Sequence, residues 1–502
     1  MEKITVPKLL RKYRGWVRKG HIQFLKNGSD EQKDILKLLG GLIVDFDKAS
    51  KGGDISENLD WYEAHEKGKK LWHALSSYAL NNIDPSSKGS ADLFKFLDAA
   101  TEFEDLLYGL ELYYRDHTLH SLWVYFIGEY LLREDLRYAY KNFNWFLYND
   151  IERDKSQYKE GLVKKAKKRE RELCNKVNSY KDAIWCIIAL CHDLGYSISK
   201  LSKLNEKVEK VLGFLDLHDL QPVGYSLNIE HQYLISQFLE LMAVDVRIVP
   251  SVDEQEVLIK LYRDDGTYWR LCRSLEKRQH GILSAYLIYK ILGIFAEASV
   301  RGPAEEWGLE DSEVIDNLIR GDILFAMAQH EFDFAYLDEL NSLADILVLS
   351  DELEEFSRYG RPMLSRKYYD THAECSISFR KAKKDIEIDI LYEVAPKHPL
   401  KEFFPRKAKR LFELYSLKKE KKTVSTSFYR IKSIKMRAEK NKRKLFFLLG
   451  RDFIRAYLPH TRIKGKEYKE NEYNLIAQDD ELLVATKDAN ISIKDWFKNA
   501  TE

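Results

Sequence analysis

The stretch Ala183–Gly195, AIWCIIALCHDLG, decides how the rest of the chain is interpreted. Its apolar residues run without a break to Cys191, which predicts a helix that is buried on most of its circumference. The helix then delivers an adjacent pair, His192 and Asp193, just before the glycine Gly195 that ends it. Because a carboxylate is almost never buried without a partner or a metal ion, Asp193 needs one of the two. Taken alone, the pair also fits a core histidine that is satisfied by a backbone carbonyl.

The composition indicates a helical protein with a large core. The 502 residues are enough for about three domains. Lys plus Arg (81) and Asp plus Glu (80) nearly cancel, so the net charge indicates neither a nucleic-acid partner nor a membrane surface. The 30 Tyr, 24 Phe and 9 Trp, with few Pro and Gly, favour long helices over short strands. Five cysteines without C-x-x-C spacing indicate reduced thiols, and the absence of any apolar run of about 18 residues predicts no membrane span. We therefore expect a cytoplasmic protein.

The chain divides into three parts by pattern. Residues 1–91 contain helical segments without a titratable cluster, and we expect an N-terminal helical packing or assembly segment. Residues 92–361 carry the motifs described below, with two expected insertions at about 150–181 and 196–275. The first insertion is so highly charged that an exposed helix is its simplest interpretation.

The pattern changes in residues 362–502. Asp385–Val394, DIEIDILYEV, alternates strictly and predicts a strand, with Ser376–Lys381 as its possible partner. Residues 401–444 are strongly basic and interleaved with Phe, Tyr and Leu. Such a segment can grip a polyanion, and a solvated charged helix is the alternative. We expect a small C-terminal α/β tail after a mainly α-helical body.

Further histidines and carboxylates stand on, or at the end of, apolar segments with helical spacing. Imidazoles and carboxylates that converge from several helices form a site for divalent cations, in which one carboxylate can bridge two ions. The side chains that we expect to converge are His120, His192, Asp193, His280, His330 and Asp351.

The order and wording of these motifs resemble the HD superfamily of metal-dependent phosphohydrolases. HSLWV at His120 resembles the first-histidine motif of that family, and ALCHDLG resembles its defining His–Asp pair. HGILSA at His280 and AMAQH at His330 resemble the histidine motifs of the dinuclear branch, and LVLSDELEEF at Asp351 resembles the closing aspartate. The resemblance covers about residues 92–362. It implies an HD-domain helical core between an N-terminal helical extension and the C-terminal tail.

Two of these positions have competitors. His117 lies three residues before His120 on the same helix face, but only His120 stands in the family's wording. Asp345 competes with Asp351, which we prefer because it directly follows the apolar run and precedes ELEEF. The histidines of the two later motifs could instead cap helices or fill the core. The histidines that fit no motif, which we expect on the surface or in loops, are His218, His231 and His372.

The sequence departs from the family pattern in two places. Many relatives continue the His–Asp pair with Gly-Lys or Gly-His, the latter typical of deoxynucleoside triphosphate triphosphohydrolases, whereas this chain continues with Gly195-Tyr196-Ser197-Ile198. The residue on the phosphate side is therefore not assigned. The gap between Asp193 and His280 is long, which indicates an insertion beside the site, such as a substrate lid.

The resemblance implies two divalent ions per chain, with Asp193 as the bridging ligand. His120, His192 and Asp351 would complete one site, and the remaining two histidines the other. Histidine and carboxylate ligands without a thiolate fit iron, manganese or magnesium better than a structural zinc ion. A water activated by the ions would attack phosphorus. Three arginines are candidates for binding phosphate oxygens: Arg115, Arg358 and Arg361. The alternative is that they are ordinary surface residues.

Three functions follow as hypotheses. The first is a nucleotide phosphohydrolase that cleaves a phosphoester or phosphoanhydride, such as a deoxynucleoside triphosphate or a signalling nucleotide. The second is a phosphodiesterase or nuclease that acts on a cyclic nucleotide or on single-stranded nucleic acid held by residues 401–444. The third is a non-catalytic nucleotide sensor. We also expect a homo-oligomer, because helical relatives of this size often assemble.

Overall fold

The computed structural model describes most of the first 331 residues and shorter stretches of the remainder. The described ranges are 2–51, 58–107, 116–136, 147–213, 229–296, 309–331, 342–356, 373–382, 385–395, 430–440 and 443–450, together with isolated residues at 337, 340 and between 403 and 414 and with the short strands given below. All statements that follow concern these residues.

The helical body is built around α10 (Lys181–Cys191), in which every residue is buried. This agrees with the helix predicted from the apolar run in Ala183–Cys191. Five helices contact α10 from different sides. They are α4 (Trp61–Ile83), α6 (His117–Tyr130), α15 (His280–Ile291), α17 (Asp311–Gln329) and α18 (Leu343–Leu353).

Close packing between α10 and α6 depends on a glycine. A Cβ atom built on Gly128 would lie 1.9 Å from the indole of Trp185, so only glycine allows this approach of the two helices. Every residue of α6 is buried as well. The two helices that carry the first histidine motif and the His–Asp pair are therefore packed against each other in the centre of the core.

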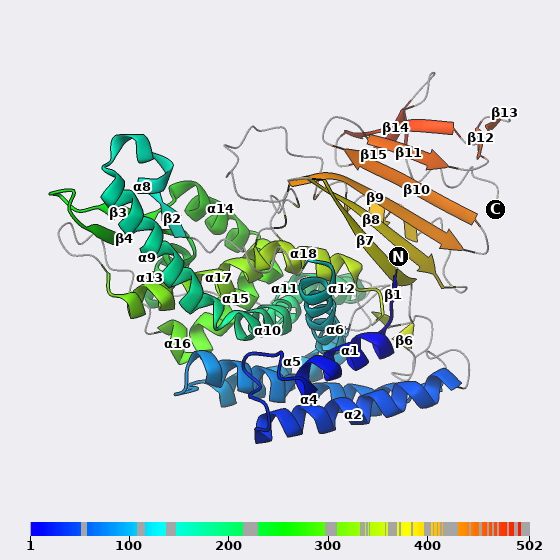
Figure 1. Cartoon of the computed structure of the whole chain (residues 1–502). Helices are drawn as coiled ribbons and strands as arrows, with labels where there is room; N and C mark the ends of the chain where they lie inside the picture. Colours follow the sequence, from blue (N-terminus) through cyan, green and yellow to red (C-terminus); the bar gives the residue numbers. More distant parts are fainter. Residues whose placement is uncertain are drawn as a thin grey trace.

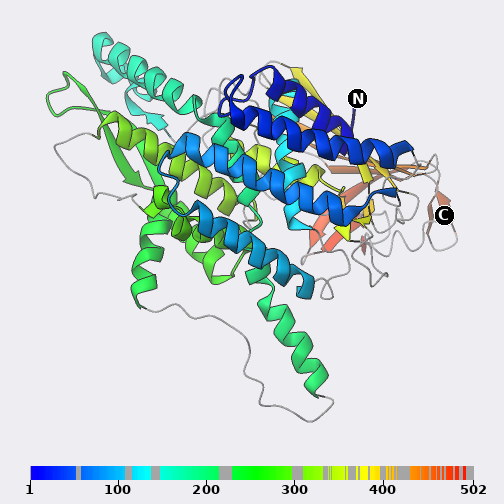
Figure 2. The same ribbon diagram turned by 90° about the horizontal axis from the view of Figure 1, so that it is seen from below.

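The remaining helices surround this centre (Figures 1 and 2). In Figure 1, α2 and α4 form the lower edge of the molecule, and Figure 2 shows α1, α2, α4 and α5 side by side. Their bounds are α1 (Val6–Arg18), α2 (Asp30–Lys51), α5 (Ser90–Leu107), α8 (Asp150–Arg153), α9 (Glu160–Asn178), α11 (Tyr196–Ser199), α12 (Leu201–Gly213), α13 (Ile229–Met242), α14 (Asp265–Glu276) and α16 (Gly293–Ala296), with a π-helical turn at Leu131–Asp135 and a 3-10 turn at Lys155–Gln157.

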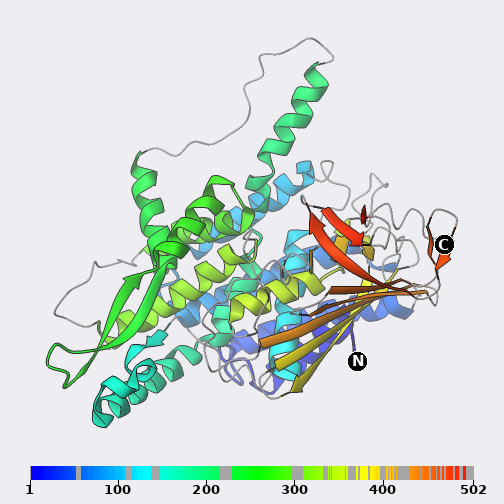
Figure 3. The same cartoon turned by 90° about the horizontal axis from the view of Figure 1, so that it is seen from above.

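A three-stranded sheet lies at one end of the helical body and a nine-stranded sheet at the other (Figure 3). The small sheet has the order β2-β3-β4, with β2 (Leu147–Asn149) parallel to β3 (Val244–Pro250) and β3 antiparallel to β4 (Val257–Arg263). It packs with α8 and α9. The helix α9 agrees with the helix expected within residues 150–181, and it buries one face through Leu162, Ala166, Leu173 and Val177.

The nine-stranded sheet joins the first residues of the chain to its last third. Its order is β1-β7-β8-β9-β10-β11-β14-β15-β16, and all described neighbours are antiparallel except the parallel pair β8–β9. The strands are β1 (Glu2–Ile4), β7 (Ala373–Ala382), β8 (Asp385–Val394), β9 (Arg430–Lys440), β10 (Arg443–Gly450), β11 (Ile454–Leu458), β14 (Asn471–Gln478), β15 (Glu481–Ala485) and β16 (Asn490–Ser492). Two further two-stranded ladders pair β5 (Arg358–Tyr359) with β6 (Tyr369–Asp370) and β12 (Thr461–Ile463) with β13 (Lys466–Tyr468).

The strand predicted at Asp385–Val394 is confirmed. Its side chains alternate between buried and partly exposed, with Ile386, Ile388, Ile390 and Tyr392 on the buried face, and its antiparallel partner β7 contains the predicted Ser376–Lys381. The described part of the chain is mainly helical, as the sequence predicts. The five cysteines are free thiols. None of the described helices combines the length and the apolar character that crossing a bilayer requires.

Candidate metal centre

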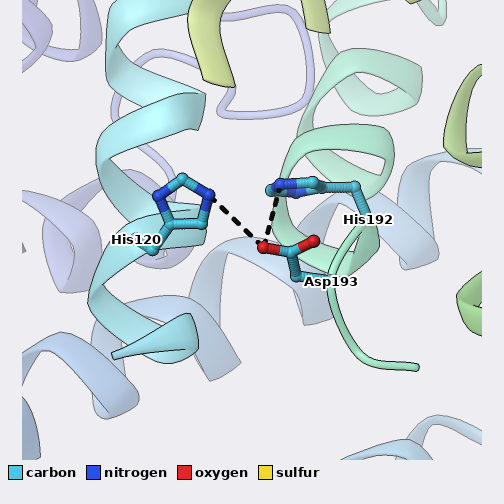
Figure 4. Close-up of side chains that lie close together, drawn as sticks. All are labelled: His120, His192 and Asp193. Atoms are coloured by element: carbon cyan, nitrogen blue, oxygen red, sulfur yellow. Dashed lines mark ion pairs between the residues drawn. The ribbon is translucent and has the colours of Figure 1, made fainter. Parts of the chain in front are cut away.

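The carboxylate of Asp193 lies at the meeting point of four histidines. Its side chain is buried, and it follows directly on His192, the residue that caps α10. Two groups of possible metal ligands share Asp193: His120 and His192 on one side, and His280 and His330 on the other. Figure 4 shows the first group, in which both imidazoles point toward the same carboxylate oxygen. The structure thus brings together five of the six predicted ligands in two groups.

The first group is completed by a second carboxylate. His120 Nε2 lies 3.3 Å from Asp193 Oδ2 and 3.1 Å from Asp351 Oδ1, and His192 Nε2 lies 3.4 Å from the same Asp193 oxygen. Asp351 is on α18, which packs against α6, the helix that carries His120. All six predicted ligands are therefore within reach of one another through Asp193 and His120.

The second group forms around the other oxygen of the same carboxylate. His280 Nε2 lies 3.0 Å from Asp193 Oδ1, and His330 Nε2 lies 3.5 Å from it. The two Nε2 atoms are 2.9 Å apart. Two nitrogens bound to one ion at about 2.1 Å and at a right angle would be separated by about 3.0 Å, so this spacing is that of neighbouring ligands. One oxygen of Asp193 faces each group, which is the geometry of a bridging carboxylate.

The four histidines are held in the same orientation by acceptors at Nδ1. His120 Nδ1 lies 2.7 Å from Glu354 Oε2, and His280 Nδ1 lies 2.6 Å from Glu331 Oε2. The other two are held by carbonyls one turn back in their own helices: His192 Nδ1 lies 2.8 Å from the oxygen of Ala189, and His330 Nδ1 lies 2.6 Å from that of Met327. Because carbonyl and carboxylate oxygens only accept, each Nδ1 carries the proton, and a neutral ring then has its lone pair on Nε2.

This orientation leaves the centre short of positive charge. The lone pair at His120 Nε2 faces two carboxylate oxygens, and those of His280 and His330 face each other. Lone pairs and anions at such distances repel unless a proton or a cation lies between them. His192 Nε2 is buried and has no hydrogen-bond partner among the described residues. The unpartnered His192 Nε2 and the close approach of the other acceptors fit a metal ion, which would accept lone pairs and neutralise the carboxylates.

The pKa values of the cluster have the same cause. Burial lowers the pKa of His192 to about 3, so this ring is neutral and its lone pair is available. Burial disfavours the charged forms of Asp193 and His280 too, but the surrounding groups outweigh it. The histidines hold the pKa of Asp193 well below its usual range, while Glu331 and Asp193 raise the pKa of His280 to about 10. Without a metal ion the centre therefore attracts a proton, for which a cation would compete.

Glycines allow the ligand-bearing segments to approach. A Cβ atom on Gly281 would lie 2.6 Å from the carbonyl oxygen of Met327 and 2.9 Å from the ring of His330, so glycine after His280 lets α15 and α17 meet. A Cβ atom on Gly195 would lie 2.5 Å from backbone atoms of α15. The glycine of the HDLG stretch therefore serves close packing, beyond ending the helix.

The end of α18 differs from the sequence prediction. The apolar spacing in SLADILVLSDELEEFSR predicts one helix over Ser342–Arg358, whereas α18 ends at Leu353, and Glu354 has an extended backbone (φ −74°, ψ 116°). This early end turns the fully buried Glu354 toward His120, and its second oxygen accepts a hydrogen bond of 2.6 Å from the amide of Phe356. Neither carboxylate that holds a histidine was predicted from the sequence, although Glu331 directly follows His330 and Glu354 lies in the ELEEF motif.

The two competing residues lie elsewhere. The ring of His117 packs against the ring of Tyr196, with centroids 3.9 Å apart, and His117 belongs to neither ligand group. Asp345 caps the start of α18, where it accepts hydrogen bonds from the amide and hydroxyl of Ser342. His231 lies on α13.

The predicted phosphate-binding arginines are not placed by the structure. Arg358 is described only by its backbone, in β5. The residues that lie outside the described part of the chain are Arg115, Arg361, His218 and His372.

A narrow cavity lies beside the bridging carboxylate. Its volume is about 20 Å³, and its lining includes Asp193, His117, Thr118, Ser121 and Ser197 together with the apolar residues Leu97, Leu190 and Leu194. A cavity of this size has room for one water molecule. A site for a single water thus exists next to the proposed metal ligands.

Several cations of the basic segment 401–444 are engaged inside the molecule. Lys407 is buried and lies 2.7 Å from Glu355 Oε1, and Arg410 Nε donates to Glu352 Oε1 over 2.8 Å. In the sheet, Arg437 pairs with Asp389 and Lys432 with Glu387. From the sequence, this segment was predicted either to bind a polyanion or to form a solvated helix. Lys407, Arg410, Lys432 and Arg437 each pair with an acidic residue, and Arg430–Lys440 forms a strand instead of a helix. Binding of a polyanion by the segment stays a prediction.

Comparisons of the chain with protein-family models, with curated proteins and with solved structures found no match. The resemblance to HD-superfamily phosphohydrolases therefore rests on the motifs of the sequence alone.

Proposed function

We propose that this protein is a metal-dependent phosphohydrolase with two divalent ions per chain, and that its substrate is a nucleotide phosphoester or phosphoanhydride. The observation that carries the proposal is the convergence of four Nε2 atoms on the two oxygens of Asp193, with an acceptor next to each Nδ1. A buried histidine network that served only packing would be expected to satisfy its acceptors internally.

The ligand set suggests which ions bind. His120, His192 and Asp351 would hold one ion, His280 and His330 the other, and Asp193 both. Imidazole-rich sets suit iron or manganese, whereas magnesium prefers oxygen ligands and keeps its waters. The carboxylates Glu331 and Glu354 would fix the ring orientation and increase the basicity of the two histidines that they hold.

When bound, the two ions would lower the pKa of a coordinated water and screen the phosphate oxygens. The residues of the chain would do the rest. Asp193 and the four histidines hold the reacting groups in one place, and burial of the cluster excludes bulk water from it. The cavity beside Asp193 has room for one water molecule within the site. This arrangement supports a hydrolysis in which water is the nucleophile, without a covalent intermediate on a side chain.

Nucleotides are proposed as substrates because of the resemblance to the HD superfamily, with a deoxynucleoside triphosphate or a signalling nucleotide as the first choice. The internal pairing of Lys407, Arg410 and Arg437 removes these cations from a nucleic-acid surface, which makes the nuclease hypothesis the weaker of the two catalytic ones. Homo-oligomer formation remains an expectation.

The test is a panel of mononucleotides, cyclic dinucleotides and oligonucleotides incubated with protein loaded with Mn²⁺ or Fe²⁺. Release of phosphate or triphosphate from a mononucleotide supports the proposal. Cleavage of oligonucleotides or cyclic dinucleotides alone would instead support a phosphodiesterase or nuclease. Tight binding of a nucleotide without product would support a sensor.

A further inference from the structure

The end of α18 contacts both the metal centre and the C-terminal part of the chain. In the stretch Asp351–Glu355, Asp351 faces His120 Nε2 and Glu354 holds His120 Nδ1. Glu352 and Glu355, which alternate with them, instead face cations from residues 406–410. Neighbouring acidic residues of one short segment are thus divided between two partners.

The first cation on the outer side is Lys407. Its side chain is 4% exposed, and its Nζ donates to the carbonyl oxygen of Glu352 over 2.7 Å and lies 2.7 Å from Glu355 Oε1. The same carbonyl accepts a hydrogen bond of 2.9 Å from the hydroxyl of Tyr392 in β8. A lysine at this depth is held only where its charge is fully paired, so the ammonium fixes the backbone directly after Asp351.

The second cation, Arg410, touches segments from both ligand groups. Its Nε donates to Glu352 Oε1 over 2.8 Å, and its NH2 group donates to the carbonyl oxygen of His330 over 3.4 Å. Glu352 neighbours Asp351 of the first group, and His330 itself belongs to the second. One planar guanidinium therefore spans the two halves of the centre, which a point charge such as lysine's ammonium does less well.

The C-terminal sheet is firmly attached to this contact. Phe404, Ala408 and Leu411, which alternate with the cations, are buried, and the buried face of β8 belongs to the same hydrophobic core as the helices. Figure 1 shows α18 directly beside β7 and β8, and Figure 3 shows the same neighbourhood from above. Residues 406–410 cannot leave α18 without exposing this apolar surface.

We propose that the C-terminal sheet and residues 406–410 are a structural part of the metal centre, and that Lys407 and Arg410 are positioning residues for Asp351, Glu354 and His330. The inference rests on the proposed metal site. It gives the C-terminal part of the chain a function in metal retention. The outer contacts of positioned ligands are commonly worth 10- to 100-fold in metal affinity.

The test compares Arg410→Gln and Lys407→Gln with a matched control, Arg437→Gln, in the full-length protein. Arg437 pairs with Asp389 within the same sheet but does not contact α18 through any described hydrogen bond. Mn²⁺ affinity and the rate of Mn²⁺ loss to a chelator are measured well below the unfolding temperature, together with the unfolding midpoint of the metal-free protein. We expect 10- to 100-fold weaker binding and faster loss in the first two variants. The control should stay within about twofold of the wild type, inside the scatter of ordinary surface changes.

A merely structural role would lower the unfolding midpoint and leave Mn²⁺ affinity and loss unchanged, and that result would overturn the inference. If Arg410→Gln does not fold, Arg410→Lys decides instead: it retains charge and loses the fork, and wild-type Mn²⁺ retention in it would contradict the role assigned to the guanidinium. Absence of Mn²⁺ binding in the wild type would refute the proposed function itself. If the wild type binds Mn²⁺ and the two variants bind and retain it equally well, this inference alone is refuted.

Discussion

Replacing Glu354 with glutamine should weaken metal binding without unfolding the protein. The carboxylate is fully buried and lies 2.7 Å from His120 Nδ1. Glutamine has the same shape, so the packing around the end of α18 is preserved, but the hydrogen bond to the ring loses its charge. The ring also becomes free to take the other tautomer, in which Nε2 carries the proton and has no lone pair for an ion.

The magnitude follows from the kind of contact. Hydrogen bonds to a charged group contribute about 1.5–3 kcal/mol. At about 1.4 kcal/mol per factor of ten, this amounts to roughly 10- to 100-fold in affinity, the range typical of contacts behind a metal-bound histidine. We therefore expect Mn²⁺ binding by Glu354→Gln to be weaker by about this factor, as measured by titration calorimetry with metal analysis of the dialysed protein.

The matched control is Glu129→Gln, on the same helix as His120. Glu129 is buried like Glu354, but its partner is Arg133 in the π-helical turn that follows α6. This variant should bind Mn²⁺ as the wild type does. Equal affinity in Glu354→Gln and the wild type would refute the reasoning that tautomer and charge at His120 control the centre. So would an equal loss in both variants, which would indicate a general effect of removing a buried carboxylate.

Four further results are expected. Asp193→Ala should lose both ions and all hydrolytic activity while keeping its helical circular dichroism, and full activity in this variant would exclude the mechanism. His280→Ala should lower the metal content toward one ion per chain, so an unchanged content of two ions would show that the second site is wrongly assigned. Gly281→Ala, whose added Cβ would lie 2.6 Å from the Met327 carbonyl oxygen, should force α15 and α17 apart and lower both the unfolding midpoint and Mn²⁺ affinity; a wild-type midpoint would contradict the close packing. Burial raises the pKa of Glu129 to about 7 against the opposing effect of Arg133, so the folded state holds a proton there that the unfolded chain loses near pH 4.5. The stability contributed by this group is complete below about pH 4.5 and is lost as the pH rises through about 7. Urea unfolding between pH 5 and 8 should show a smaller decline in Glu129→Gln than in the wild type, and identical slopes would refute the assignment.

The elements that the sequence predicts best are those in which a local pattern coincides with burial. The apolar run Ala183–Cys191 and the alternation in Asp385–Val394 both reflect packing on a fixed periodicity, and both elements form as expected. The same holds for α17: the apolar spacing predicts a helix over about Ser312–Gln329 that ends at His330, in agreement with the observed bounds Asp311–Gln329. In the site, the residues that flank each candidate were enough to prefer His120 over His117 and Asp351 over Asp345.

Elements that form through contacts with residues far away in the chain could not be predicted from local sequence patterns. The three residues of β1 form a strand only because Glu2–Ile4 pair with β7, more than 370 residues later in the chain. The residue types of Asp264-Asp265-Gly266 predict a turn, but these residues start α14, where the Asp264 side chain accepts a hydrogen bond from the amide of Gly266. The residues that favour turns also favour helix N-caps. A lysine such as Lys407 is expected in solvent from its residue type. Only its contacts with Glu352 and Glu355 account for its burial.

The early end of α18 belongs to the same class. Its sequence, ELEEF, contains good helix formers, so propensity predicts that the helix continues. The contact of Glu354 with His120, 234 residues away in sequence, outweighs that local preference. Residues that hydrogen-bond the non-ligating nitrogen of a candidate metal ligand are for this reason the hardest to identify from sequence, since nothing in their flanking sequence distinguishes them.

The central claim is that the side chains around Asp193 bind two ions. The most direct measurement is anomalous diffraction at the manganese edge from crystals of protein loaded with Mn²⁺, combined with the metal content of the same preparation. The account predicts two peaks on either side of the Asp193 carboxylate, one beside His120 and His192 and the other beside His280 and His330, each about 2.0–2.2 Å from the Nε2 atoms. A fully loaded preparation without a peak between these imidazoles would contradict it.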